Sequence, residues 1–239
     1  MNGTMDYFYA PPERIDGRYV VIEGDELSHL AHVMRKKAGD RIMVVDGTGC
    51  AYDVVLETVT KRSARGIVRE SYRRYHEPEP NVTLAVGILK NPSKFDFLVE
   101  KATEIGVIGI IPMRTERTIP SHAKTDRWQK LALSAMKQCG RSSLPKVGEL
   151  TSLEEVLRTG GSYRRTFVAH VDADHPAFGD KPILAGADST LILVGPEGGF
   201  SEDEISRCAA AGFEPLSLGE RRLRTETAAI ALTILECRR

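Results

Sequence analysis

The chain has 239 residues, of which 41% are hydrophobic and 28% are charged, and its 33 basic and 33 acidic side chains give a formal net charge of zero. This composition predicts a soluble globular protein with ample apolar content for a buried core. No run approaches the roughly 18 apolar residues of a membrane helix, and the start, MNGTMDYFYAPPERIDG, lacks the regions of a signal peptide, so we expect a cytoplasmic protein.

The first 75 residues predict a small β-barrel or sandwich. Four short apolar stretches indicate strands, and turn signals such as DGTG and AGD break them at close intervals. One helix is expected between the first two strands, beginning at Asp25 or Ser28 and ending at Lys37. The strands are expected over 19–23, 41–47, 51–59 and 64–72.

The pattern changes after HEPEPN, residues 76–81. This segment has two prolines and no apolar residue, which predicts a linker between two domains. Beyond it, VTLAVGILK is a continuous apolar run of the kind found in parallel strands that are buried on both faces. The next segment predicts a helix with Ser93 as N-cap and Gly106 as its stop, and a later helix should end at Gly140.

Strands and helices then alternate to the C-terminus, which predicts an α/β domain with a parallel sheet over residues 82–239. Ser201 and Glu204 form a capping box for one helix, and Gly212 should end it. The remaining strands are expected over 107–113, 165–173, 189–195 and 213–219, and the remaining helices over 126–139 and 225–238.

Two glycine-bearing turns, GPEGGF at 195–200 and LSLGERRLRTETA at 216–228, each follow a predicted strand and precede a predicted helix. Ligands of such sheets bind outside the carboxyl ends of the strands, where both turns lie. Neither turn has the GxGxxG of a dinucleotide site, and the GK[ST] of a Walker loop is absent. Pro196 fixes its own φ and the glycines allow close approach, which indicates a site of main-chain groups. The alternative for each turn alone is an ordinary connection.

Basic side chains gather in two stretches. Residues 61–74 hold six Lys or Arg against one acid, Glu70, and Arg221, Arg222 and Arg224 form the second group. A local patch rather than the net charge sets the attraction to phosphate, so residues 61–74 are a candidate RNA surface. The alternative is a strand with a solvated basic face.

No metal site is predicted. The four cysteines form no CxxC pair and have no histidine at ligand spacing, and the six histidines form no HExxH motif. We therefore expect reduced thiols in the core or on the surface. The cysteines are Cys50, Cys139, Cys208 and Cys237.

The two turns, read as GPEGGFSEDEI and LSLGERRLRTETAAIAL, closely resemble the ribosomal RNA small subunit methyltransferase E family of the SPOUT superfamily, whose members methylate N3 of a uridine in 16S rRNA. The resemblance runs along nearly the whole chain. HLAHVMRKKAGDRIMVVDGTG is similar to the family's N-terminal RNA-binding segment, KFDFLVEKATEIGVIGIIPMRTERT to its first α/β unit, and MKQCGRSSLPKV to its central motif.

The resemblance implies a C-terminal domain with a deep trefoil knot that holds S-adenosylmethionine. Because the imide proton of uridine N3 is only weakly acidic, we hypothesise that Arg224 stabilises the anionic uracil and that Glu197 or Glu226 accepts the proton, directly or through water. For Glu226 the alternative is a purely structural acid, since the first turn of a helix favours negative charge. The residues implied to surround the cofactor are His170, Gly195, Glu197, Gly198, Leu216, Ser217, Leu218, Gly219, Leu223 and Arg224.

The resemblance further implies that residues 1–75 form a PUA-like RNA-binding barrel and that the partner is 16S rRNA in the small (30S) subunit. It also implies a homodimer, for which the apolar C-terminal helix is a plausible face. In the barrel, the predicted RNA-binding residues are Lys61, Arg62, Arg65 and Arg69. Arg114, Arg117 and Arg141 are candidates for binding phosphates or the extruded base, with ordinary surface arginines as the alternative.

Two other functions stay open from the sequence. The first is a ribose 2′-O-methyltransferase of the same superfamily, which would share the cofactor fold. The second is a non-catalytic RNA-binding ribosome-assembly factor, against which the intact glycines of both turns argue. A cofactor titration separates the second from the enzymes, and the identity of the modified nucleoside separates the two enzymes.

Overall fold

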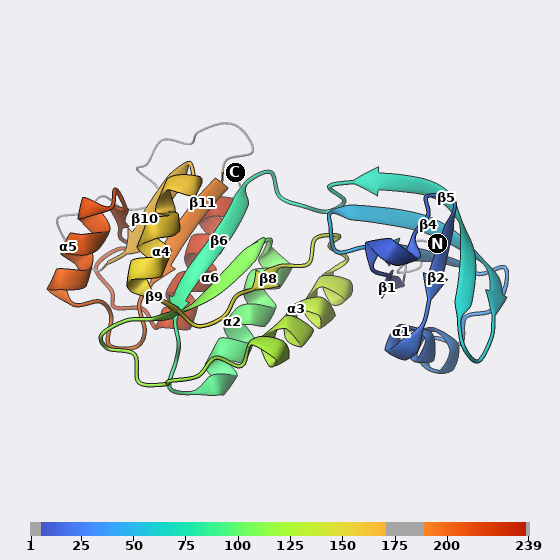
Figure 1. Ribbon diagram of the computed structural model, residues 1–239, viewed down its shortest axis with the longest axis horizontal. Coiled ribbons are helices and arrows are strands. Elements are labelled where there is room, and N and C mark those ends of the chain that lie inside the picture. The colour runs from blue at the N-terminus through green and yellow to red at the C-terminus, as the bar shows by residue number, and fades with distance from the viewer. Residues whose placement is uncertain (1–5, 171–188, 238–239) are drawn as a thin grey trace. The chain divides into compact units, whose positions relative to one another are not determined.

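The computed structural model of the chain describes residues 6–170 and 189–237 (Figure 1). Contacts divide the chain into two compact units. The first unit comprises residues 1–77 together with 136–144, and the second comprises residues 78–135 and 145–239. The sequence did not indicate that residues 136–144 group with the N-terminal part of the chain.

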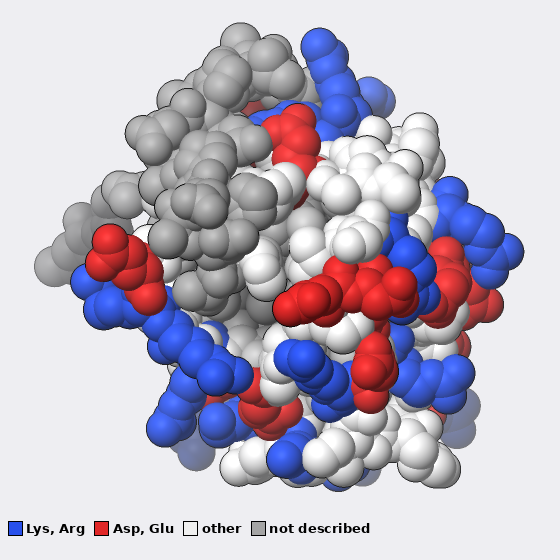
Figure 2. All heavy atoms as spheres, turned by 90° about the vertical axis from the view of Figure 1, so that its left-hand side faces the viewer, with Lys and Arg blue, Asp and Glu red and all other residues white. Residues whose placement is uncertain are grey.

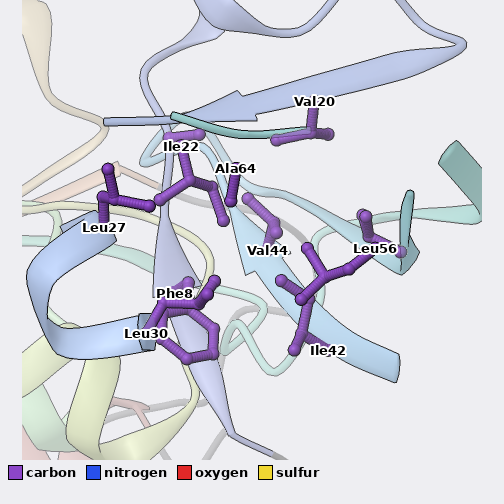
Figure 3. Packing of buried hydrophobic residues seen from close by; sticks show 11 residues of the cluster. Phe8, Val20, Ile22, Leu27, Leu30, Ile42, Val44, Leu56 and Ala64 are labelled. Atoms are coloured by element: carbon purple, nitrogen blue, oxygen red, sulfur yellow. The ribbon is translucent and has the colours of Figure 1, made fainter. Parts of the chain in front are cut away.

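The first unit is built on a five-stranded sheet with the strand order β1-β3-β4-β5-β2. β1 pairs with β3 in parallel, and the other neighbours are antiparallel. Alternate residues of these strands point into an apolar cluster that includes Phe8, Ile22, Leu30 and Ile42 (Figure 3). The strands are β1 Tyr7–Tyr9, β2 Tyr19–Ile22, β3 Arg41–Val45, β4 Cys50–Val59 and β5 Ala64–Arg73.

The predicted helix of this unit is shorter than expected. α1 spans Gly24–Ser28 and continues as a π-helical turn over His29–Val33, so it begins one residue before Asp25. Arg35 has a left-handed backbone with φ 54°, which is incompatible with a right-handed helix and prevents the run from reaching Lys37. A short 3-10 turn, Pro12–Arg14, lies before β2.

The second unit has the predicted parallel sheet, with the order β12-β10-β11-β6-β7-β8 and with β9 also paired to β7. Every described pairing in this sheet is parallel. The two-residue strands β8 and β9 were not predicted, because so short a segment shows no periodicity. The strands are β6 Asn81–Gly87, β7 Gly109–Arg114, β8 Lys146–Val147, β9 Thr151–Ser152, β10 Arg165–Ala169, β11 Ser189–Val194 and β12 Glu214–Leu216.

Helices cover both faces of this sheet, as the fully buried residues of β11 require. Residues of α4 and α5 pack with Ala85, Leu191 and Leu193 on one face. α6 contacts β6 and β11 and packs against α2. The helices are α2 Pro92–Ile105, α3 Thr125–Cys139, α4 Leu153–Thr159, α5 Glu202–Ala210 and α6 Thr225–Cys237, with a 3-10 turn at Gly160–Ser162. No helix in the described ranges is long and apolar enough to cross a membrane.

Beyond residue 82, helix ends follow the predicted signals with one exception. The capping box of Ser201 and Glu204 is confirmed. Ser93 as N-cap is wrong: the N-cap of α2 is Asn91, whose side chain accepts a hydrogen bond from the Ser93 amide at 3.0 Å. Pro92 at the first helical position explains the difference, because proline is favoured there and the cap lies just before it. Gly106 and Gly140 end α2 and α3 with φ of 138° and 74°.

Two further expectations concern the linker and the thiols. The segment expected as a linker, residues 76–81, is partly built into the fold, because Asn81 belongs to β6 and the Glu77 side chain is only 5% exposed. Cys50 and Cys208 are free thiols. Burial raises the pKa of the Cys208 thiol to about 11, which makes it a packing residue rather than a nucleophile. The trefoil knot stays a prediction.

Candidate functional site

The first glycine turn leaves β11 at Val194 and is very tightly folded. A Cβ on Gly195 would lie 3.0 Å from the backbone of Gly199, so no larger residue fits without displacement. Gly199 has φ 69°, and its amide donates to the Pro196 carbonyl at 2.8 Å. Pro196 itself packs against Gly87 of β6, where an added Cβ would come within 2.5 Å of its ring. The turn is therefore fixed by close backbone packing against the sheet.

The second glycine turn follows β12 at Leu216. Gly219 adopts φ 97°, and its amide donates to the Ser217 hydroxyl at 3.1 Å. The His170 amide, at the end of β10, donates to the Leu216 carbonyl at 2.9 Å. The ends of β10 and β12 thus bring His170 and the second turn together at the carboxyl edge of the sheet.

Side chains from elsewhere hold three carbonyl groups of the first turn. The buried Thr225 hydroxyl, at the start of α6, donates to the Gly195 carbonyl at 2.9 Å. Arg222 donates to the Glu197 carbonyl at 3.3 Å, and Arg117 donates to the Gly198 carbonyl at 2.9 Å. The two turns are therefore joined directly. The Thr225 hydroxyl thus ties the start of α6 to the first turn.

A cavity of about 550 Å³ lies between the two turns. Nine of the ten residues implied to surround a cofactor line it, and Ser217 alone does not, since its hydroxyl is used inside the second turn. The nine are His170, Gly195, Glu197, Gly198, Leu216, Leu218, Gly219, Leu223 and Arg224. The sequence did not assign the other lining residues to a cofactor site: Lys94, Arg117, Ala169, Val194, Pro196, Gly199, Phe200, Arg221, Arg222, Thr225 and Ala228.

The two candidate proton acceptors lie in different environments. Glu197 lines the cavity, and its Oε1 accepts a hydrogen bond from the Lys90 amide at 3.0 Å. Glu226 is 8% exposed and does not line the cavity, but its Oε1 lies 3.2 Å from Nζ of Lys94, which does. Within the described ranges its Oε2 is buried and has no hydrogen-bond partner. Glu226 is thus a buried carboxylate with one oxygen still able to accept a proton.

Lys94 was missed by the sequence reasoning. It lies in the first turn of α2, where the helix dipole disfavours a positive charge, so local helix physics does not explain it. Its pairing partner, Glu226, is 132 positions further along the chain, and only the packing of α6 against α2 brings the two together. The lysine was therefore detectable as a locally unfavourable residue but not as a member of this site.

The predicted RNA-binding residues of the first unit are all exposed: Lys61, Arg62, Arg65 and Arg69. Arg65 lies over the Tyr19 ring at 3.8 Å and 3.8 Å from a Glu57 carboxylate oxygen, so the fold holds its guanidinium in place. Arg69 is the extra residue of a bulge where β5 pairs with β4, since Asp53 pairs with Glu70 and Val54 with Val68. Bulges redirect side chains, which separates Arg69 from the regular alternation of the strand.

The other three arginine candidates differ in their surroundings. Arg114 is exposed at the end of β7, and Arg117 lines the cavity. The structure does not support Arg141 as a phosphate ligand. Its side chain is 3% exposed and donates to the Glu77 carboxylate at 2.6 Å, and this pair joins residues 136–144 to the rest of the first unit.

Figure 2 shows basic and acidic side chains intermingled over the face that it draws, so attraction to RNA depends on small clusters.

Comparison with known proteins gives the class of the protein. A family model described as RNA methyltransferase domain matches residues 76–235, and one described as RNA methyltransferase PUA domain matches residues 22–69. The parallel sheet with its cavity and the small β unit before it are therefore those of a two-domain RNA methyltransferase.

Individual relatives are more specific. Ribosomal RNA small subunit methyltransferase E of Synechocystis sp. is 33% identical over 91% of this chain and 72% of its own length, and that of Bacillus subtilis is 30% identical over 87% and 85%. The solved structure of this enzyme from Neisseria gonorrhoeae, bound to S-adenosyl methionine, aligns at a TM-score of 0.85 and 32% identity over 96% of this chain and 95% of that chain. A Legionella pneumophila protein solved with the bound cofactor aligns at 0.83 and 28% identity, over 98% of each chain. The chain belongs to the ribosomal RNA small subunit methyltransferase E family.

Proposed function

We propose that this protein transfers a methyl group from S-adenosylmethionine to N3 of a uridine in 16S rRNA. The observation that carries the proposal is the cavity formed by two directly joined glycine turns at the carboxyl edge of the parallel sheet, in a chain of this family. A volume of about 550 Å³ lies within the range of small-molecule sites. Structural relatives solved with the same cofactor support the choice of ligand.

The residues present fit this cofactor. The carbonyls of the first turn are engaged within the protein, so we expect the amides of Glu197 and Gly198 and the backbone groups from Leu216 to Gly219 to read the edge of an adenine. Leu216, Leu218 and Leu223 line the same cavity and offer apolar surface for its faces. The bound cofactor supplies an electrophilic methyl carbon on a sulfonium centre. The protein's contribution is to hold the accepting nitrogen in line with that carbon, which supplies much of the acceleration.

Uridine N3 must lose its imide proton before or during transfer. The proton passes to a carboxylate, Glu197 or Glu226, directly or through water, while Arg224 offers positive charge to the uracil oxygens on which the anion resides. The nitrogen electron pair forms the new N–C bond, and the sulfur keeps the pair of the bond that breaks. Glu197 has the advantage of lining the cavity, and Glu226 has the advantage of a buried oxygen that no other described residue binds.

The target uridine must be unpaired or extruded, because N3 lies on the Watson–Crick edge. Recognition then depends on RNA shape and phosphate contacts. The exposed basic side chains of the PUA-like unit support a docking role for its β5 region, together with Arg114 and Arg117. We propose assembled 30S subunits as the substrate. A homodimer through α6 fits this proposal, since Ile234 and Leu235 of that helix are exposed at 36% and 41%.

The test is to incubate the protein with a labelled methyl donor and small subunits from a strain that lacks this gene, and then to digest the RNA to nucleosides. N3-methyluridine is the expected product. A ribose-methylated nucleoside would favour the 2′-O-methyltransferase instead. Binding of the donor without any transfer to RNA or subunits would favour the non-catalytic assembly factor.

Removing the basic side chains Lys61, Arg62, Arg65 and Arg69 together by alanine substitution should weaken RNA binding. Each phosphate contact that is lost should reduce the slope of log affinity against log salt by about 0.7 to 0.9. Fluorescence anisotropy with a labelled 16S rRNA fragment over a salt series measures both quantities. A matched control removes four exposed basic side chains of the second unit: Lys124, Lys130, Lys146 and Arg158. Equal loss in both variants would show that the β5 region has no special role.

A further inference from the structure

The cavity wall carries more positive than negative charge. Its described lining residues include four arginines and one lysine but a single acid, Glu197. The lysine, Lys94, is ion-paired with Glu226. The four arginines, here called the arginine rim, are Arg117, Arg221, Arg222 and Arg224.

The positive charge of the arginine rim is not neutralised within the described part of the chain. No carboxylate of residues 6–170 or 189–237 forms an ion pair with any of the four. Arg117 and Arg222 donate to the neutral carbonyls of Gly198 and Glu197. Glu220 lies in the same turn, but it is exposed and does not line the cavity. All four guanidinium groups belong to exposed residues.

This excess of positive charge does not suit the methyl donor that the proposed function places in the cavity. S-Adenosylmethionine carries a sulfonium, an ammonium and a carboxylate, and therefore a net charge of +1. Once the methyl group has left, S-adenosylhomocysteine has a net charge of zero. A unit charge about 4 Å from an arginine changes the binding free energy by about 1 kcal/mol even at the dielectric of bulk water, which is a severalfold change in Kd, and by more where the effective dielectric is lower. The arginine rim therefore disfavours the donor relative to the product.

A polyanion removes this mismatch. Arginine forks bind phosphate oxygens in pairs, and a phosphodiester backbone supplies one negative charge per nucleotide. We propose that the arginine rim couples the binding of the two substrates: without RNA the cavity prefers the neutral product, and phosphates of bound RNA cancel the repulsion and shift the preference to the cationic donor. The coupling is reciprocal, so the donor also strengthens RNA binding. This inference rests on the proposed function and assigns Arg221 and Arg222 to RNA phosphate.

The ratio of two dissociation constants tests the coupling. Calorimetric titrations of the purified protein give the Kd of S-adenosylmethionine and of S-adenosylhomocysteine, which differ only in the methyl group and its charge. Damage to the cavity alters both constants, so the ratio isolates charge. We expect the product to bind about tenfold more tightly at about 0.01 M ionic strength, and the difference to shrink severalfold at about 1 M, where the Debye length falls from about 30 to 3 Å.

A short oligocytidylate provides the phosphates without a uridine, so no methyl transfer occurs during the titration. It should strengthen donor binding severalfold and leave product binding nearly unchanged. The double variant Arg221→Ala/Arg222→Ala should lose most of the salt dependence of the ratio and most of the oligocytidylate effect. Arg158→Ala is the matched control, because Arg158 is 75% exposed on α4 and does not line the cavity.

Each outcome decides the matter. If the ratio of the two dissociation constants does not change with salt, with oligocytidylate or with the loss of both arginines, the coupling is wrong. The proposed function then still stands, because both ligands bind. Failure of the donor to bind even when oligocytidylate is present overturns the proposed function and the coupling with it.

Discussion

Replacing Arg224 by alanine should lower kcat for methyl transfer by about 100-fold to 1,000-fold, the usual cost of losing one donor to a developing anion. The reason is that deprotonated uracil spreads its charge over two oxygens, and Arg224 is a cavity-lining cation without a carboxylate partner among the described residues. The Kd of S-adenosylmethionine should change little or improve, since its contacts in the second turn are expected to be with the backbone.

Single-turnover rates on small subunits, measured beside donor titrations, provide the test. Arg224→Lys retains the charge but not the planar fork and should recover part of the rate. Arg158→Ala should behave like the native protein. A loss confined to donor affinity, with an unchanged single-turnover rate, would remove Arg224 from the chemistry and leave it a cofactor-binding residue only.

The carboxylate assignment is tested in the same assay. Loss of the true proton acceptor should cost about 100-fold to 10,000-fold in rate. Glu197→Gln and Glu226→Gln keep the side-chain volume, and Glu226→Gln also keeps an acceptor for Lys94. Turnover that survives both changes would eliminate a carboxylate base. A large effect of Glu226→Gln alone would show that the buried oxygen of Glu226 is reached by substrate or by a water chain.

The sequence predicted the parts of this site that depend on local backbone chemistry. A side chain at Gly195 would collide with the backbone of Gly199, and Gly199 and Gly219 have positive φ values that other residues rarely adopt. Both requirements select glycine, so they are visible in the sequence. Buried parallel strands are equally visible, because they are apolar on both faces. The carboxyl edge of the sheet then collects the two turns at one place. This explains why nine of the ten residues lie around one cavity.

The missed features depend on contacts between distant segments. Lys94 and Glu226 meet only because α2 and α6 pack together. Arg117 joins the site because the loop after β7 comes next to the first turn, where a Cβ on Gly198 would lie 3.1 Å from its side chain. Arg141 was misassigned for the same reason: from the sequence, a buried arginine with a distant acid cannot be distinguished from an exposed one. Side-chain partners, unlike turns, carry no local signal.

The same first turn shows why the cavity depends on more than glycines. Its carbonyls of Gly195, Glu197 and Gly198 accept hydrogen bonds from Thr225, Arg222 and Arg117, respectively. Such satisfied acceptors fix the orientation of the peptide planes on which a main-chain site relies. Side chains that line the cavity therefore also fix its main-chain wall, and two of them, Arg117 and Arg222, belong to the arginine rim.

Glu77→Ala should have the largest effect on stability, lowering the free energy of unfolding of the first unit by about 3–5 kcal/mol. The Glu77 side chain is 5% exposed and accepts from Arg141 at 2.6 Å and from the Ser142 and Ser143 amides at 2.9 and 2.8 Å. The substitution leaves the Arg141 guanidinium, which is itself 3% exposed, without its carboxylate partner, and it leaves the Ser142 and Ser143 amides without this acceptor. Glu77→Gln, which keeps an acceptor oxygen, should cost less.

Urea unfolding of the full chain, followed by tyrosine fluorescence and far-ultraviolet circular dichroism, measures the change. The matched control is Glu23→Ala, because Glu23 pairs with Arg14 at 2.8 Å in the same unit while both side chains are about 40% exposed. Exposed pairs contribute about 0–1 kcal/mol, so this variant should unfold almost like the native protein. If the two alanine variants lose the same stability, Glu77 is not the residue that binds segment 136–144 to the first unit. A large difference would show that the buried carboxylate of Glu77 anchors residues 140–143 (GRSS) of the central motif. It would also explain why Arg141 in that motif stabilises the fold and does not bind RNA.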